Sequence, residues 1–139
     1  MSDLFHEKVP FEFIDKVIKT ILTTPQHKYQ ILTKRAKRMH EYFTAHEIPV
    51  NAWLVVTVDV ATSKDRIDYL RQLPAAIKFL SCEPLLEDLG MMNLAGIDWV
   101  IIGGESGVRA RPMKEEWAVF SMSGIAQFLA GCKSLYTPS

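Results

Sequence analysis

Carboxylates follow three of the four apolar runs of this chain, at positions where strand ends would bring them together. The residues directly after the runs are Thr33-Lys34-Arg35, Thr57-Val58-Asp59, Ser81-Cys82-Glu83-Pro84 and Gly103-Gly104-Glu105-Ser106. A carboxylate on a concave face can act as a base, bind a metal or receive an amine. Glycines beside it let a ligand approach the backbone closely. Although polar residues follow strands in any α/β protein, the pattern predicts a site that includes Glu83, Gly103, Gly104, Glu105 and Ser106.

One basic cluster accompanies these carboxylates. It consists of Lys34, Arg35, Lys37 and Arg38, and two further arginines, Arg109 and Arg111, follow the last apolar run. If the loops converge, these side chains can receive phosphates. Lys34 and Arg35 are the predicted ligand-binding residues of the cluster because they directly follow a strand. Lys37 and Arg38 are expected in a solvated first helical turn.

Two other residues near the strand ends are expected to be structural. Asp59 is predicted to cap a helix that begins near Ser63. Cys82 is predicted to be a structural thiol, since no histidine partner for a nucleophile is identifiable. The second cysteine, Cys132, is about 50 residues away, which fits neither a disulfide framework nor a closely spaced metal motif. We therefore expect no metal site.

Composition sets the broad class of the protein. The chain has 139 residues, of which 48% are hydrophobic and 23% charged, which is typical of one soluble globular domain. Its net charge of +0 excludes a whole-molecule attraction to nucleic acid or to an anionic membrane, so any such binding must be local. No apolar run approaches the roughly 20 residues that span a bilayer. We expect a cytoplasmic protein with no membrane partner.

Apolar periodicity predicts alternating helices and strands. Helices are expected from Pro10 to about Thr24, over 36–46 and 64–72, and from Lys114 onward; strands are expected over 29–32, 51–58, 77–80 and 98–102. A repeat of roughly 23 residues leaves room only for strand, turn, helix and turn. The fold class is therefore α/β, with parallel strands and right-handed crossovers. Ligands of such folds sit at the carboxyl ends of the strands.

Several motifs in a fixed order resemble a known family. They are Met1-Ser2-Asp3-Leu4-Phe5-His6, Leu32-Thr33-Lys34-Arg35, Ser81-Cys82-Glu83-Pro84-Leu85-Leu86, Gly96-Ile97-Asp98-Trp99-Val100-Ile101-Ile102-Gly103-Gly104-Glu105-Ser106-Gly107 and Ala110-Arg111-Pro112-Met113. Together they resemble the phage gene-product-thirty-seven/sixty-eight family, also described as three-cysteine-motif proteins. The resemblance runs to about Trp117. Asp3 and His6 of the first motif are further candidate ligand-binding residues, although a lone histidine near an apolar pair is more often structural.

The resemblance implies a radical-SAM-like partial TIM barrel of six β/α units. In such proteins a Cys-x-x-x-Cys-x-x-Cys loop holds an iron-sulfur cluster, and S-adenosylmethionine is the cofactor. This chain has two cysteines, so we expect no cluster in it and leave open whether it is an enzyme. Residues 1–117 would form an incomplete (β/α)6 barrel. Residues 118–139 would form a divergent closing helix or a frameshifted tail, with no strand.

Three functions are compatible with these observations. The first is a truncated phage or prophage protein whose parent activity is S-adenosylmethionine-dependent redox chemistry, with nucleic acid as one conceivable substrate. The second is a small non-catalytic α/β module that binds an anionic ligand at Lys34, Arg35 and Glu105. The third is a remnant that completes its barrel with a second copy or another chain, because an interrupted barrel leaves exposed strand edges.

Overall fold

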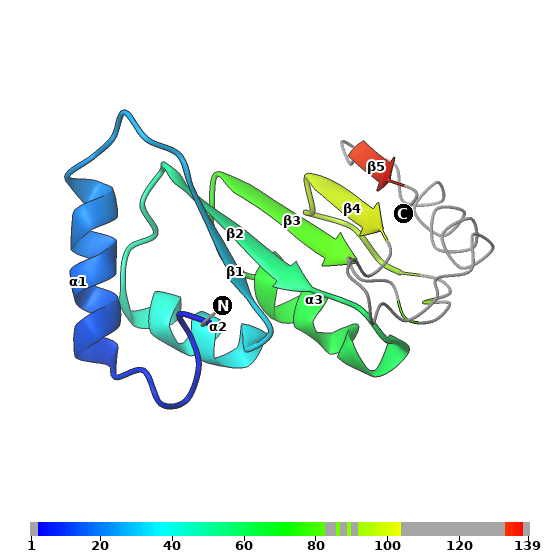
Figure 1. Cartoon of the computed structure of the whole chain (residues 1–139), viewed down its shortest axis with the longest axis horizontal. Helices are drawn as coiled ribbons and strands as arrows, with labels where there is room; N and C mark the ends of the chain where they lie inside the picture. The colour runs from blue at the N-terminus through cyan, green and yellow to red at the C-terminus, as the bar shows by residue number, and fades with distance from the viewer. Residues whose placement is uncertain (1–2, 83–85, 87–88, 90–91, 104–132, 138–139) are drawn as a thin grey trace, which may run out of the picture.

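A computed structural model describes residues 3–82, 86, 89, 92–103 and 133–137. Helices and strands alternate along the chain, as the periodicity predicts (Figure 1). The elements are α1 (Phe11–Leu22), β1 (Tyr29–Thr33), α2 (Ala36–Ala45), β2 (Ala52–Thr57), a short 3-10 turn (Ala61–Ser63), α3 (Asp65–Arg71), β3 (Ile77–Cys82), β4 (Trp99–Gly103) and β5 (Lys133–Thr137). The expected helix from Lys114 onward lies outside the described residues.

The helices bury the apolar stripes that predicted them. In α1 the buried side chains are Ile14, Ile18 and Ile21, spaced at one helical turn. Pro10 precedes the first turn, where its missing N–H costs nothing. Tyr42 of α2 joins α2 to α1, because its hydroxyl donates a 2.6 Å hydrogen bond to Asp15. Burial and the Asp15 carboxylate raise the pKa of Tyr42, so this phenol stays protonated.

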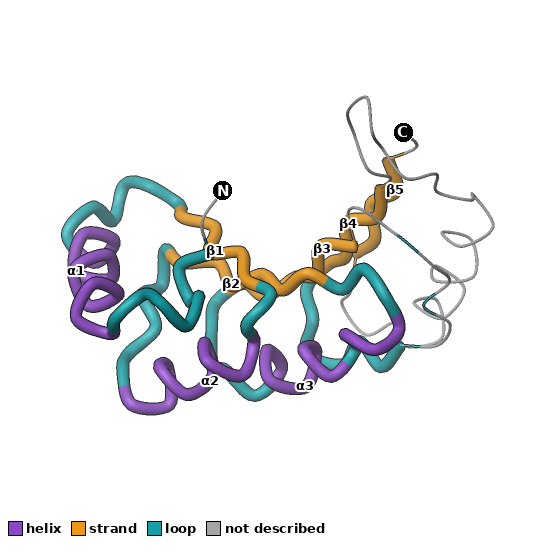
Figure 2. Tube along the Cα trace, turned by 60° about the horizontal axis from the view of Figure 1, so that its bottom comes forward, coloured by secondary structure: helices purple, strands orange, loops and turns teal. Residues whose placement is uncertain are grey.

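The strands form one parallel sheet in the order β1-β2-β3-β4-β5. This confirms the α/β fold class and the parallel arrangement of the four predicted strands. Helices α2 and α3 lie on one face of the sheet, and α1 lies beside its β1 edge (Figure 2). Within the described part of the chain, no helix covers the opposite face. The carboxyl ends of all the strands point to the same edge, where the sequence places its site.

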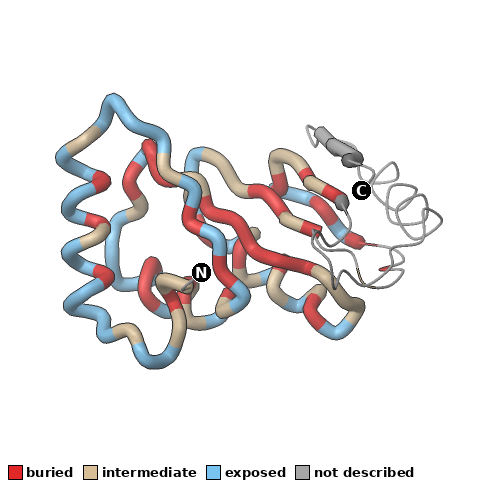
Figure 3. The backbone as a smooth tube through the Cα atoms, viewed as in Figure 1, coloured by how far each residue is buried: buried red, intermediate tan, exposed pale blue. Residues whose placement is uncertain are grey.

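The two faces of the sheet have different side chains. On the helix-covered face, Ile31, Leu54, Leu80 and Val100 lie in the main core. Buried residues run almost without interruption along β2 (Figure 3). On the other face, the Trp99 ring stacks on Phe79 at 4.7 Å and meets Trp53 edge-on at 5.6 Å. Nearer the carboxyl ends, Thr57 and Ser81 are paired in register on this same face.

Strand β5 corrects the sequence analysis. No strand was expected after Trp117, yet Lys133–Thr137 pairs in parallel with β4, from Trp99 opposite Lys133 to Gly103 opposite Thr137. Local composition did not reveal it because a strand of five residues gains its stability from its neighbour in the sheet. The proposed boundary between 117 and 118 lies outside the described residues. No helix in the described part of the chain has the length and apolar character needed to span a membrane.

Candidate functional site

The carboxyl edge of the sheet brings together charged side chains from separate elements. Lys34 follows β1 and Asp59 follows β2, and the Lys34 ammonium nitrogen lies 3.8 Å from an Asp59 carboxylate oxygen. Arg66 reaches the same carboxylate from α3 at 4.0 Å. Lys34 is 54% exposed, whereas Asp59 is 14% exposed. Two cations thus flank one largely covered carboxylate at the edge where parallel α/β sheets bind ligands.

Asp59 is held in place by its neighbours in the chain. The Ser63 hydroxyl contacts its carboxylate at 3.4 Å and donates a shorter bond of 2.7 Å to the Val60 carbonyl. The Asp59 carbonyl accepts a 3.1 Å bond from the Leu86 N–H. The predicted capping role of Asp59 is therefore realised only as a long contact with Ser63. The same carboxylate also lies within ion-pair distance of Lys34 and Arg66, and the sequence does not indicate its contact with Arg66.

Asp3 forms a second charged group at this edge, which we call the Asp3 clasp. Its carboxylate accepts hydrogen bonds from the Thr33 hydroxyl at 2.7 and 2.9 Å, from the Lys34 N–H at 2.9 Å and from the Phe5 N–H at 2.9 Å. Arg35 lies 3.5 Å away. Partial burial opposes ionisation, but these bonds and the Arg35 charge outweigh it and lower the pKa of Asp3. The clasp fixes the N-terminal segment to the end of β1.

Arg35 and His6 have mainly local partners. Arg35 pairs with Asp3 and, at 3.4 Å, with Glu7, and its own N–H donates to the Thr33 hydroxyl. The His6 Nδ1 atom accepts a 3.1 Å bond from the Lys8 N–H. The carbonyl of His6 accepts a 2.6 Å bond from Arg38. The structure thus brings Asp3, Arg35 and His6 into one N-terminal network rather than around Asp59.

The solvated position predicted for Arg38 is wrong. Its guanidinium donates to the His6 and Val9 carbonyls and lies 4.7 Å from the centre of the Phe11 ring. These contacts tie the segment before α1 to α2. The sequence predicts a solvated side chain because Arg38 lies in the first turn of a helix. The carbonyls that it binds lie about thirty residues earlier in the chain, so local sequence does not reveal them. Lys37 is exposed, as expected.

Cys82 is confirmed as a structural thiol. It is 0% exposed at the end of β3 and belongs to the core on the helix-covered face. Burial first, and the nearby Asp59 charge second, raise its pKa to about 12. A thiol of this kind is protonated at neutral pH, which makes it a poor nucleophile and a poor metal ligand.

Several predicted site residues lie outside the part of the chain that the structure describes. They are Glu83, Gly104, Glu105, Ser106, Arg109 and Arg111. Gly103 is described as the last residue of β4, so the predicted glycine pair begins at the carboxyl edge of the sheet. Whether Glu83 and Glu105 face Lys34 stays a prediction.

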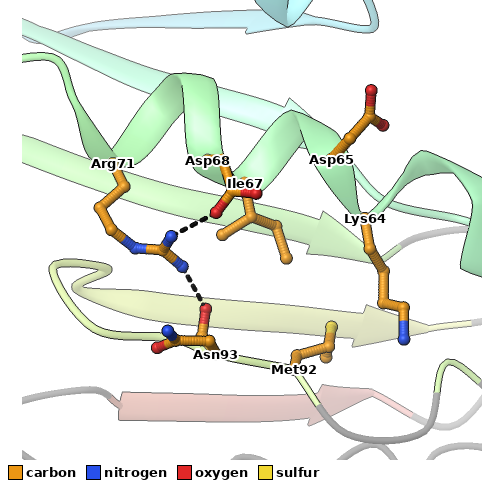
Figure 4. Close-up of a pocket in the computed structure, with 7 residues that line it drawn as sticks. All are labelled: Lys64, Asp65, Ile67, Asp68, Arg71, Met92 and Asn93. Atoms are coloured by element: carbon orange, nitrogen blue, oxygen red, sulfur yellow. Dashed lines mark hydrogen bonds and ion pairs between the residues drawn. The ribbon is translucent and has the colours of Figure 1, made fainter.

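A pocket of about 230 Å³ lies between α3 and the segment that leads to β4 (Figure 4). Arg71 spans it and binds the Asp68 carboxylate and the Asn93 and Ala95 carbonyls. At its other end, the Lys64 ammonium donates a 2.9 Å bond to the Leu89 carbonyl. The cations of the pocket thus bind backbone carbonyls of the segment before β4. We therefore assign this pocket a structural role, in which it attaches that segment to α3.

Comparison with known families gives one assignment. Residues 1–127 match the model of a family described as a protein of unknown function, DUF5131. The chain belongs to this family. No curated protein and no solved structure matches the chain. The family description carries no activity, so the function must be argued from the site.

The residues described do not fit the iron-sulfur cluster that the radical-SAM resemblance implies. Such a cluster takes three thiolates from one loop in that enzyme class, and the sequence contains only Cys82 and Cys132. Cys82 is fully covered by the core. In the described part of the chain, no three His, Cys, Asp or Glu side chains group as metal ligands.

Proposed function

We propose that this member of the DUF5131 family binds an anionic ligand at the carboxyl edge of its sheet, with Lys34 as the contacting cation. The supporting observation is the excess of positive charge around Asp59, where the two cations Lys34 and Arg66 flank a single carboxylate. Arg66 also donates a 2.6 Å bond to the Thr57 carbonyl, so it is fixed to the scaffold. Lys34 is the more exposed cation, and its flexible ammonium can turn from Asp59 to a ligand.

The face of the sheet opposite α2 and α3 carries the other polar groups that this proposal uses (Figure 2). Aromatic rings fill its amino half, whereas the small hydroxyl side chains of Thr57 and Ser81 lie nearer the carboxyl edge. Thr57 is buried and Ser81 is half-buried, so in this proposal the Ser81 hydroxyl is the one that a ligand held by Lys34 can reach. The predicted residues Glu105, Arg109 and Arg111 would complete this site from the loop after β4.

The experiment is a titration of the ¹⁵N-labelled chain with pyrophosphate and, separately, with S-adenosylmethionine, followed by amide chemical shifts. We expect shifts at the residues that follow β1, β2 and β3. Lys34→Gln should weaken binding several-fold, because one charge-assisted contact is lost. Lys28→Gln is the matched control, since Lys28 precedes β1 and so lies at the opposite end of the same strand. Equal losses in both variants would show that only net charge matters and would contradict the proposal.

A radical-SAM activity of the family is the second candidate. One observation favours it: the helices α2 and α3 lie on one face of a parallel sheet and no helix of the described residues lies on the other (Figure 2), as in a (β/α) barrel. In this proposal the chain is part of an incomplete barrel of phage or prophage origin, and another chain would have to supply the cluster. Anaerobic treatment of the chain with iron and sulfide tests whether this chain holds a cluster by itself. We expect no stoichiometric iron on the chain, and four irons per chain with the visible absorbance of a cluster would favour the enzyme.

A further inference from the structure

Among the residues that the structure describes, none pairs with the outer hydrogen-bonding edge of strand β1. This strand pairs with β2 on one side, and it is the first strand of the sheet in the described part of the chain. The Tyr29 N–H donates a 2.9 Å bond to the Asn51 carbonyl on the β2 side. Because successive backbone groups of a strand alternate in direction, the N–H and C=O groups of Gln30 and Leu32 point away from β2. Two donors and two acceptors are thus arranged for one more strand.

The chain closes this edge at one end. Lys34 is the next residue whose N–H points outward, and the Asp3 clasp satisfies it with a 2.9 Å hydrogen bond. The open part of the edge is therefore limited to the length of β1, Tyr29–Thr33. This length suits the insertion of a short strand, and it leaves no long edge for indefinite aggregation.

An apolar groove of about 250 Å³ accompanies the edge. Its lining comes from the N-terminal segment, α1 and β1, and consists of Leu4, Val17, Ile21, Tyr29, Gln30, Ile31 and Leu32. Leu32 is 41% exposed, which is unusual for a large apolar side chain in a strand of this sheet. A strand added to β1 would place one side chain in the groove and another beside Leu32. The edge therefore offers backbone bonds for affinity and a pocket for specificity.

We propose that the β1 edge binds an extended segment of another polypeptide, with apolar residues at its centre and acidic residues at its ends. The charge requirement comes from the flanks of β1, where Lys28 precedes the strand and Lys34 follows it. Lys28 is exposed, and Lys34 is 54% exposed. Acidic residues at both ends of an added strand would face these two lysines, and opposite charges across strands stabilise a pairing.

The same two lysines make a second copy of this chain a poor occupant of the β1 edge. Two β1 strands related by a two-fold axis pair antiparallel, and all outward groups are used only when Gln30 of one copy faces Leu32 of the other. In that register Lys28 of each copy faces Lys34 of the other copy. Two like-charge pairs then arise in one short contact. Of the occupants that the sequence leaves open, a different chain fits this edge better than a second copy.

The test uses a synthetic fluorescent peptide of alternating valine and threonine with two aspartates at each end. A second peptide carries lysines at its ends, and a third has the acidic ends but N-methylated backbone amides. We expect the acidic peptide to bind about fivefold more tightly than the lysine peptide at low ionic strength, as measured by anisotropy. The N-methylated peptide should not bind, because it lacks the donors that a strand needs.

Two variants locate the binding. Lys28→Glu should lower the ratio of the affinities for the acidic and the lysine peptide to near one. Lys19→Glu, at an exposed position of α1, should leave this ratio unchanged. Gln30→Pro should abolish binding, because it removes an outward N–H at an edge where proline is tolerated. No binding of any peptide, equal binding of the acidic and lysine peptides, or a dimer by light scattering that excludes the acidic peptide would overturn the proposal.

Discussion

Asp3 and Asp59 lie at the same edge of the sheet and are equally covered, each at 14% exposure, yet they differ in their contacts. Hydrogen bonds of 2.7 to 2.9 Å hold the Asp3 carboxylate. The contacts of Asp59 with Ser63, Lys34 and Arg66 measure 3.4, 3.8 and 4.0 Å. A carboxylate whose bonds are all made stabilises the fold. A carboxylate with long contacts to its cations leaves the more exposed one, Lys34, able to bind something else.

The difference follows from the groups that surround each carboxylate. Asp3 is bound by two backbone N–H groups and a buried hydroxyl, which have fixed positions. Asp59 faces the ends of long side chains, whose positions cost entropy to fix. The exposed fraction of a carboxylate therefore does not separate a structural role from a binding role at this edge. The two roles are separated instead by the groups that contact the carboxylate, which are fixed backbone and hydroxyl donors at Asp3 and the ends of long side chains at Asp59.

The largest expected effect is that of Asp3→Ala. Removal of the carboxylate leaves the Thr33 hydroxyl and the N–H groups of Phe5 and Lys34 without their acceptor. We expect a loss of about 2 to 3 kcal/mol in the free energy of unfolding, since bonds to a charged acceptor are individually worth about 1.5 kcal/mol or more. Urea unfolding measures it. Glu47→Gln is the control, because Glu47 is exposed, and a loss for Asp3→Ala as small as the control's would contradict the structural role of the clasp.

A smaller effect is expected in the pH dependence of stability. The pKa of Asp3 is lowered from its ordinary value of 3.8 in the folded chain, so the unfolded state binds more protons as the pH falls through that range. The contribution of Asp3 is complete above the unfolded pKa and is lost as the pH falls from there toward the folded pKa. Asp3→Asn should therefore flatten the acid limb of the stability curve. Identical acid limbs in the two proteins would show that Asp3 is not held as an anion.

The fold could be read from the sequence because its signals are local. The apolar runs Trp53 to Val56 and Trp99 to Ile102 predict strands by themselves, and the spacing of Ile14, Ile18 and Ile21 predicts a helix. Strand β5 was missed because its evidence is not local: Lys133–Thr137 carries no run of comparable strength, and its pairing with β4 stabilises it. Sequence periodicity detects burial within a segment and not the hydrogen bonds that a neighbour provides.

The candidate site was predictable only in part, for a similar reason. Position after a strand correctly placed Lys34 and Asp59 at one edge. Nothing in the order of the residues shows that Arg66 turns back from α3 to Asp59, or that Asp3 reaches across to Thr33. Asp3 was a candidate for ligand binding, and Asp59 was assigned to a helix cap.

The smallest effect on stability is expected for Asp59→Asn. This variant tests most directly the difference between the roles of Asp3 and Asp59. Contacts of 3.4 to 4.0 Å between partly exposed groups contribute less than about 1 kcal/mol, and an asparagine can still receive the Ser63 hydroxyl. Binding of pyrophosphate, in contrast, should become a few-fold tighter, because Lys34 and Arg66 lose the carboxylate that competes with the ligand. Asp3→Asn should not have this effect. Calorimetric titration of both variants measures the difference, and weaker binding in Asp59→Asn would mean that Asp59 orients Lys34 for the ligand instead of competing with it.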